Sequence, residues 1–184
     1  MTKIALTTMC LFSMVYAQEC SYELLQPKVA WKAFKTYEKV GVKGAFDKIE
    51  LISKQNSTIE ASLIGSTVDI SVQSLNSGNK GRDETLLKSF FGAQNVSSIK
   101  AVIKGIKGNK LLVDITMNKI TKTIPMQYTF ANDVVSGKGV IDLSDFDMLP
   151  SLKSINKACF DLHEGKTWQD VELEFELKTA KKCK

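Results

Sequence analysis

The chain has 184 residues and a formal net charge of +5, with 43% hydrophobic and 24% charged side chains. This composition suits one globular domain with a sizeable core and excludes an intrinsically disordered chain. The basic residues are spread along the sequence, and no run of Lys and Arg is interleaved with aromatic side chains, so we expect no nucleic-acid partner.

The first segment, residues 1–17, is typical of a secretory signal peptide. Lys3 gives a cationic start, an apolar run follows over residues 4–15, and we place the cleavage after Ala17. The run is too short for a stable membrane anchor, and no later stretch is long and apolar enough to span a bilayer. We therefore expect an exported protein, periplasmic in a Gram-negative source, with one folded domain over residues 18–184.

Most of that domain alternates between apolar and polar side chains, as do strands with one dry and one wet face. Residues 57–75 alternate with a break at Gly65, which we interpret as a bulge or bend inside one long strand. Further strands are expected, in chain order, over residues 98–108, over 109–133 as a hairpin with a turn near Asn118 and Lys119, over 134–146 and over 167–181.

Two segments break this alternation. Residues 83–91 place apolar side chains at helical spacing behind Asp83, which can cap a helix. Residues 144–156 place an apolar side chain about every third position. A short helix is expected in each segment.

About eight strands with few helices predict a sandwich or a closed barrel. Long alternating terminal strands would be aggregation-prone edges in a sandwich, and closure removes that hazard. The pattern therefore favours an all-β fold, a closed antiparallel eight-stranded barrel with one or two short helices. The interior of such a barrel holds either packed side chains or one small ligand.

Three cysteines follow the signal segment: Cys20, Cys159 and Cys183. An oxidising compartment favours a disulfide, and the odd number leaves one thiol. If the first and last strands pair antiparallel, Cys20 meets Cys183, and we favour this pairing. A Cys20–Cys159 disulfide and three free thiols remain as alternatives.

Patterns for catalysis are missing from the sequence. His163 is the single histidine, so a zinc site built from several histidines is excluded within one chain, and there is no GxSxG, P-loop, HExxH or CxxC motif. We expect no metal, no cofactor and no enzyme activity. His163 precedes a Glu-Gly turn, which favours a structural or surface role over a hydrogen bond at a pocket mouth.

Several motifs, in order along the chain, resemble those of the YceI-like family of exported lipid-binding proteins. They are VGVKGAFDKIE, DISVQSLNSGNKGRDETLLKSFFG, LLVDITMNKITKTIPMQYTF, GVIDLSDFDM and KTWQDVELEFEL. In the third motif Lys119-Ile120 stands where the family has Gly-Val, so the turn geometry is open. The resemblance implies a lipocalin-like barrel around one long apolar tunnel that holds an isoprenoid chain or a fatty amide.

The resemblance also implies candidate site residues and a partner. Phe90 and Phe91 would line or close one end of the tunnel, and Arg82 would bind an anionic or amide head. The remaining candidate walls are Trp31, Phe34 and Trp168. Core packing of the aromatic rings, or a salt bridge of Arg82 with Asp83, is the alternative.

The expected partner is an amphiphilic lipid, such as a polyisoprenoid, a quinone-like molecule or a fatty amide. The expected role is that of a periplasmic carrier. A barrel filled by its own side chains, acting as a structural or interaction module, is the alternative function. The resemblance to the family also leaves a homodimer open.

Overall fold

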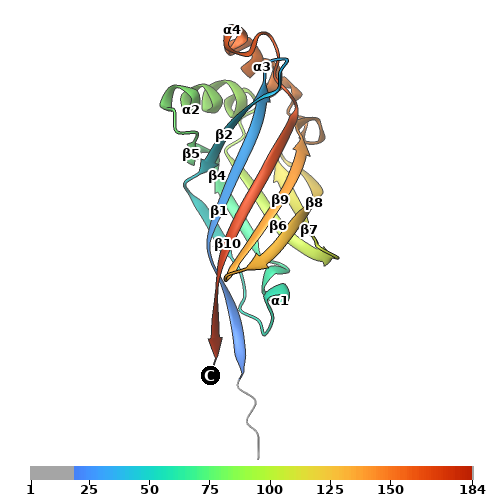
Figure 1. The fold of residues 1–184 in the computed structure, drawn as a ribbon. Coiled ribbons are helices and arrows are strands. Elements are labelled where there is room, and N and C mark those ends of the chain that lie inside the picture. Colours follow the sequence, from blue (N-terminus) through green and yellow to red (C-terminus); the bar gives the residue numbers. More distant parts are fainter. Residues whose placement is uncertain (1–18, 184) are drawn as a thin grey trace, which may run out of the picture.

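The computed structural model describes residues 19–183, so the predicted signal peptide lies outside the described residues. Within them, antiparallel strands form one curled sheet (Figure 1). The strands are β1 (Cys20–Lys35), β2 (Val40–Phe46), β3 (Ile49–Ile52), β4 (Thr67–Ser71), β5 (Leu75–Asn76), β6 (Ser98–Lys107), β7 (Lys110–Met117), β8 (Ile120–Ala131), β9 (Val134–Asp142) and β10 (Asp170–Cys183).

Short helices cover the two ends of this sheet. In Figure 1, α1 lies at the lower end, while α2, α3 and α4 gather at the upper end. The helical segments are α1 (Ile59–Leu63), η1 (Val72–Ser74), α2 (Lys80–Leu86), η2 (Leu87–Phe91), η3 (Gly92–Gln94), η4 (Leu143–Phe146), α3 (Leu149–Ala158) and α4 (Phe160–His163). The two helices predicted from the sequence are therefore present, and α1 and α4 are additional.

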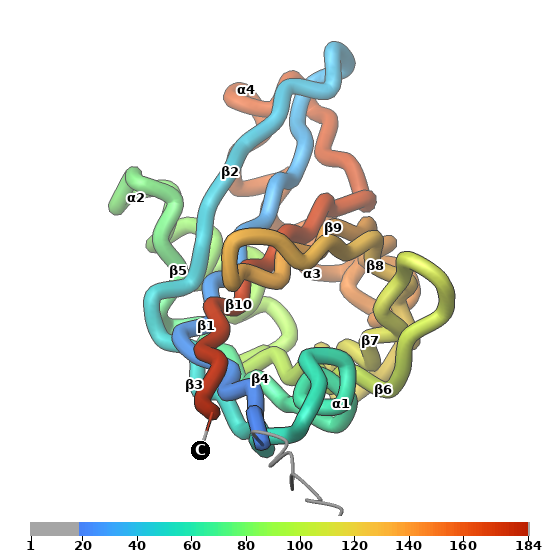
Figure 2. Tube along the Cα trace, turned by 60° about the horizontal axis from the view of Figure 1, so that its bottom comes forward, coloured from blue at the N-terminus to red at the C-terminus, as the bar shows by residue number. Residues whose placement is uncertain are grey.

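The strand order is β3-β4-β6-β7-β8-β9-β10-β1-β2-β5, and every neighbouring pair is antiparallel. The all-β antiparallel prediction is confirmed. The prediction of a closed ring of eight strands is not confirmed. The described sheet has ten strands and is a curled half-barrel (Figure 2). The strand number differs because two short segments, β3 and β5, each form a separate outer strand.

At the lower end, β1 contacts the segment between β3 and β4. The Tyr22 amide in β1 donates to the Asn56 carbonyl after β3, at 2.8 Å. The Ser62 hydroxyl of α1 donates to the Tyr22 carbonyl at 3.0 Å. Ile59 and Leu63 of α1 are buried at 6% and 0% exposure, so this helix seals the lower end of the half-barrel.

The prediction of one long strand over residues 57–75 is wrong. Thr58 caps α1 by accepting a hydrogen bond from the Ala61 amide, and the chain leaves the helix through Gly65 with a φ of +83°. Only β4 and the two-residue β5 are extended in this segment. The local side chain-to-backbone cap outweighs the period-two pattern, because alternation alone does not exclude a single helical turn.

Elsewhere the alternating pattern sets the faces of the strands as expected. In β7 every second residue from Leu111 to Met117 is buried. On β10, the even-numbered Glu172 and Glu174 form ion pairs outside with Lys32 at 3.2 Å and Lys138 at 2.9 Å. Odd positions of β10 therefore face the interior and even positions face solvent.

The favoured disulfide is confirmed. β1 and β10 pair with Cys20 directly opposite Cys183, and the two sulfurs are bonded. Cys159 is a free, partly buried thiol at the end of α3.

Candidate ligand-binding site

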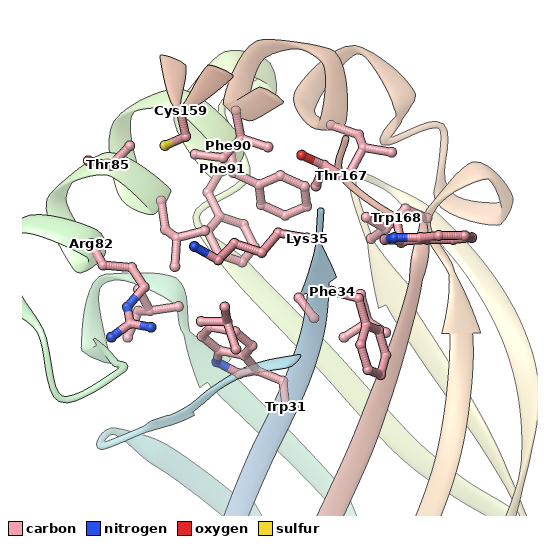
Figure 3. A pocket seen from close by; sticks show the side chains of 18 of the residues that line it. Trp31, Phe34, Lys35, Arg82, Thr85, Phe90, Phe91, Cys159, Thr167 and Trp168 are labelled. Atoms are coloured by element: carbon pink, nitrogen blue, oxygen red, sulfur yellow. The ribbon is translucent and has the colours of Figure 1, made fainter. Parts of the chain in front are cut away.

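A cavity of about 480 Å³ lies inside the upper end of the half-barrel. Strands β1, β2, β6, β7, β9 and β10 supply its walls, and α2, η2, α3 and α4 cover it (Figure 3). Its size is within the range of ligand pockets in proteins, and most of the lining side chains are apolar. The interior is therefore not filled by the protein's own side chains at this end.

All six residues predicted as ligand contacts line this cavity. They come from β1, from the α2–η2 segment and from the loop before β10, and they are Trp31, Phe34, Arg82, Phe90, Phe91 and Trp168.

Phe90 and Phe91 lie at the upper wall of the cavity (Figure 3). Their rings meet edge to face, with centroids 4.9 Å apart and an interplanar angle of 82°. They end the π-helical turn η2, in which the Gly92 amide bonds to the Leu87 carbonyl. A Cβ on Gly92 would lie 2.8 Å from that carbonyl oxygen, so glycine is needed where the turn closes. The wide turn thereby keeps both rings at the cavity.

Arg82 is the only arginine in the sequence, and it lies in the first turns of α2. The helix is capped by Asn79, whose side chain accepts from the Arg82 amide at 3.0 Å, and not by Asp83 as predicted. The Asp83 carboxylate instead accepts from the Ser77 amide at 2.9 Å. Among the described residues no carboxylate lies within ion-pair distance of Arg82, and its buried Nε has no partner. The alternative of an Arg82–Asp83 salt bridge is therefore not realised.

Trp31, which also lines the cavity, has a second unpartnered donor. Its indole Nε1 is buried and makes no hydrogen bond within the described chain. The ring lies across Gly44, which is directly opposite on β2; a Cβ there would come within 2.3 Å of the indole. The glycine therefore allows the indole to lie flat along the cavity wall.

Unlike Trp31, Phe34 and Trp168 have no unpartnered donor. Phe34 extends from the other side of β1 (Figure 3), as expected for an even position. The Lys39 ammonium lies 4.9 Å from the centroids of both rings, and the Trp168 Nε1 already donates to the Thr36 carbonyl at 2.8 Å. These rings thus form a rim held by lysine and backbone contacts, with no free donor for a ligand.

The charged lining groups of the cavity are cationic. Lys35 and Arg82 both line it, whereas the lining within the described chain includes no Asp or Glu. The Lys35 ammonium donates to the Leu162 carbonyl at 3.0 Å, a neutral partner that leaves its charge uncompensated. The cavity therefore has a positive potential and apolar walls.

His163 also lines the cavity and belongs to a chain of hydrogen bonds, which is the alternative that the sequence disfavoured. Thr167 donates its hydroxyl proton to the Asn156 side-chain oxygen at 2.9 Å. The Thr167 oxygen must then accept from His163 Nδ1, which lies 2.9 Å away. Burial, and next the charge of Lys35, lower the pKa of His163. Neutral His163 therefore presents Nε2 as an acceptor.

Neither a metal centre nor a membrane-spanning helix is found in residues 19–183. No group of three or more His, Cys, Asp or Glu side chains is placed to hold a metal ion there. None of the helices in this range combines the length and the apolar character that a bilayer crossing requires.

A curled antiparallel sheet around an apolar interior defines an all-β class of small half-barrel proteins with an internal pocket. Residues 26–179 match the family model of the YceI-like domain, and the chain belongs to this family. No curated protein sequence gives a significant match.

Solved structures share the fold. A polyisoprenoid-binding domain from Saccharophagus degradans superposes with a TM-score of 0.63 at 12% identity, covering 89% of this chain and 98% of that one. BcnA of Burkholderia cenocepacia gives 0.58 at 20% identity, covering 84% and 96%. The YceI protein of Campylobacter jejuni gives 0.51 at 19% identity, covering 78% and 85%. At these identities the likeness establishes the fold alone.

Proposed function

We propose that this chain is an exported carrier that binds one amphiphilic lipid, with the hydrocarbon tail in the cavity and the polar head beside Arg82 and Trp31. The observation that supports this most is the pairing of an apolar cavity of about 480 Å³ with two buried N–H donors that have no protein partner. One ligand can satisfy both features.

The energetics favour such a ligand. Each buried methylene contributes about 0.8 kcal/mol, so a long alkyl or prenyl tail gains several kcal/mol without any catalytic group. A buried donor without an acceptor costs about 1–3 kcal/mol, and a head oxygen placed between Arg82 and Trp31 removes that cost. The tail supplies affinity and the head fixes orientation.

The positive charge of the cavity lining favours some lipid head groups over others. Arg82 and Lys35 face the cavity without a carboxylate in the described lining, so a carboxylate or phosphate head is favoured over a neutral amide or a quinone carbonyl. The structural likeness to a polyisoprenoid-binding domain supports a prenyl tail. On this proposal the half-barrel acts as a lipocalin-like barrel that encloses the tail, and the protein works by binding and not by catalysis.

An exported, periplasmic location fits the covalent structure. The Cys20–Cys183 disulfide is of the kind that forms and persists in oxidising compartments. The amino-terminal signal pattern supports the same location.

The alternative of a filled, purely structural barrel receives no support from the upper cavity. A module of that kind has no need for an apolar void with two unsatisfied donors, since an unfilled cavity and unpaired donors both lower stability.

Arg82→Gln tests the head site. We expect stearic acid to bind this variant at least tenfold more weakly, equivalent to about 1.4 kcal/mol, because a charge-assisted hydrogen bond is lost. Stearamide should be affected less. Lys80→Gln is the matched control, since Lys80 is an exposed cation on the same helix that does not line the cavity. Equal stearic acid affinities for the two variants, by titration calorimetry, would contradict the assignment.

A further inference from the structure

A second cavity, of about 110 Å³, lies next to the first inside the sheet. Its walls are almost entirely apolar and include Val113 and Ile115 of β7 at 4% and 5% exposure. Phe175 of β10 and Val29 of β1 also line it. Neither Arg82 nor Trp31 lines this second cavity.

The two cavities meet at a ring of shared side chains. Five residues line both cavities, and we call them the neck: Phe46, Ile99, Met117, Ile141 and Leu173. Each belongs to a different strand, namely β2, β6, β7, β9 and β10. The neck therefore brings side chains from five strands together where the two cavities adjoin.

Three of the five neck side chains are buried in the core, and Ile99 and Leu173 are partly buried against it. Phe46, Met117 and Ile141 are 9%, 3% and 6% exposed. Met117 has an unbranched, flexible side chain that changes rotamer at low cost, whereas Ile99 and Ile141 are β-branched and stiff. A passage through the neck can thus open chiefly when the Met117 side chain changes its rotamer.

We propose that the neck divides the tail site into two compartments and thereby sets the tail length that the protein accepts. This inference rests on the proposed function. A short tail fills the upper cavity and stops at the neck. A longer tail must displace the neck side chains to enter the lower cavity.

This geometry has a measurable signature. Each methylene that gains a dry environment raises affinity about fourfold. Methylenes that reach the neck without passing it gain little, because opening the ring offsets their burial. Affinity should rise with tail length, level off, and rise again once the tail enters the lower cavity.

The test narrows the neck and compares tails of different length. Ile99→Phe places a larger ring in the neck, and Ile106→Phe is the matched control on the same strand, since Ile106 lines neither cavity. Lauric, stearic and behenic acids serve as probes, and native mass spectrometry gives the dissociation constants. We expect Ile99→Phe to weaken the binding of behenic acid at least tenfold more than the binding of lauric acid, while Ile106→Phe binds both acids as wild type does.

A widened neck gives an independent readout if the larger side chain impairs folding. Met117→Ala should merge the cavities and remove the levelling-off in the length series. Equal tail-length profiles for wild type, Ile99→Phe and Met117→Ala would overturn the neck while leaving the carrier function intact. Failure of wild type to bind any of the three acids, together with a lipid-free organic extract, would overturn the carrier function and the neck with it.

Discussion

Trp31 and Arg82 each keep a buried N–H group without an acceptor, in a chain that otherwise satisfies most of its buried side-chain donors. Arg82 was already a candidate for the polar head from the sequence, where it is also the single arginine among many lysines and lies beside a helix start. The unpaired state of the Trp31 indole could not be predicted from the sequence, since the position of the ring depends on Gly44 lying opposite on β2. That contact follows from strand register, which alternation alone does not fix.

His163 makes a pH-dependent contribution to stability. Its pKa is lowered in the folded state, so acid protonates the unfolded chain first and favours unfolding. The contribution is fully present above the ordinary pKa of 6.5 and is lost as the pH falls through the lower folded value. We expect the free energy of unfolding of the wild type to decrease across this window.

His163→Gln is the control, because no other histidine titrates in the same window. Urea unfolding at several pH values on both sides of 6.5 measures the effect. An equal slope for wild type and His163→Gln would show that the histidine is not responsible.

At the scale of elements, the β7–β8 turn is strained by its sequence. Asn118 and Lys119 both have left-handed backbone, with φ of 50° and 63°. Asn tolerates this backbone conformation, whereas the Cβ atom of Lys makes it sterically unfavourable. Asn-Gly is therefore the preferred pair in such hairpins. The turn therefore forms although Lys119-Ile120 stands where the family has Gly-Val, but Lys119 lowers its stability.

Lys119→Gly should raise the free energy of unfolding by about 0.5–1 kcal/mol. Lys110→Gly, an exposed strand position of the same hairpin, should lower it, since glycine weakens extended segments. Chemical unfolding midpoints measure both. A Lys119→Gly variant less stable than wild type would contradict the strain argument.

Elements with strong alternation were predictable, and those stabilised by a local cap were not. The strands β6 to β10 follow their period-two pattern, because one face of each is buried in the half-barrel. The helix α1 was missed because Ile59 and Leu63 fit a strand pattern as well as one helical turn. Thr58 was the available signal, as an N-cap residue three positions before Ala61.

For the whole molecule, the disulfide fastens the ends of the long β1–β10 ribbon. It closes a loop with a sequence separation of 163, which restricts the unfolded chain strongly. Reduction, or Cys20→Ser with Cys183→Ser, should lower the free energy of unfolding by about 2–4 kcal/mol. Cys159→Ser is the control, because that thiol is free. Unchanged urea midpoints after reduction would refute this role.

The number of strands and the shape of the sheet could not be predicted from the sequence. Alternation indicates that strands pair antiparallel with one dry face, but β3 and β5 are too short to produce a pattern of their own. The cavity also depends on the joint placement of ten strands and several helices. The family resemblance supplied the expectation of a tunnel that composition alone could not provide.

Native mass spectrometry of the protein, purified without detergent from its native host, tests the central claim most directly. The account predicts a complex heavier than the disulfide-linked polypeptide by the mass of one lipid, at near-stoichiometric occupancy, which dissociates into protein and an anionic amphiphile. A spectrum that contains only the unliganded polypeptide, and that stays so after incubation with stearic acid or a prenyl phosphate, would contradict it.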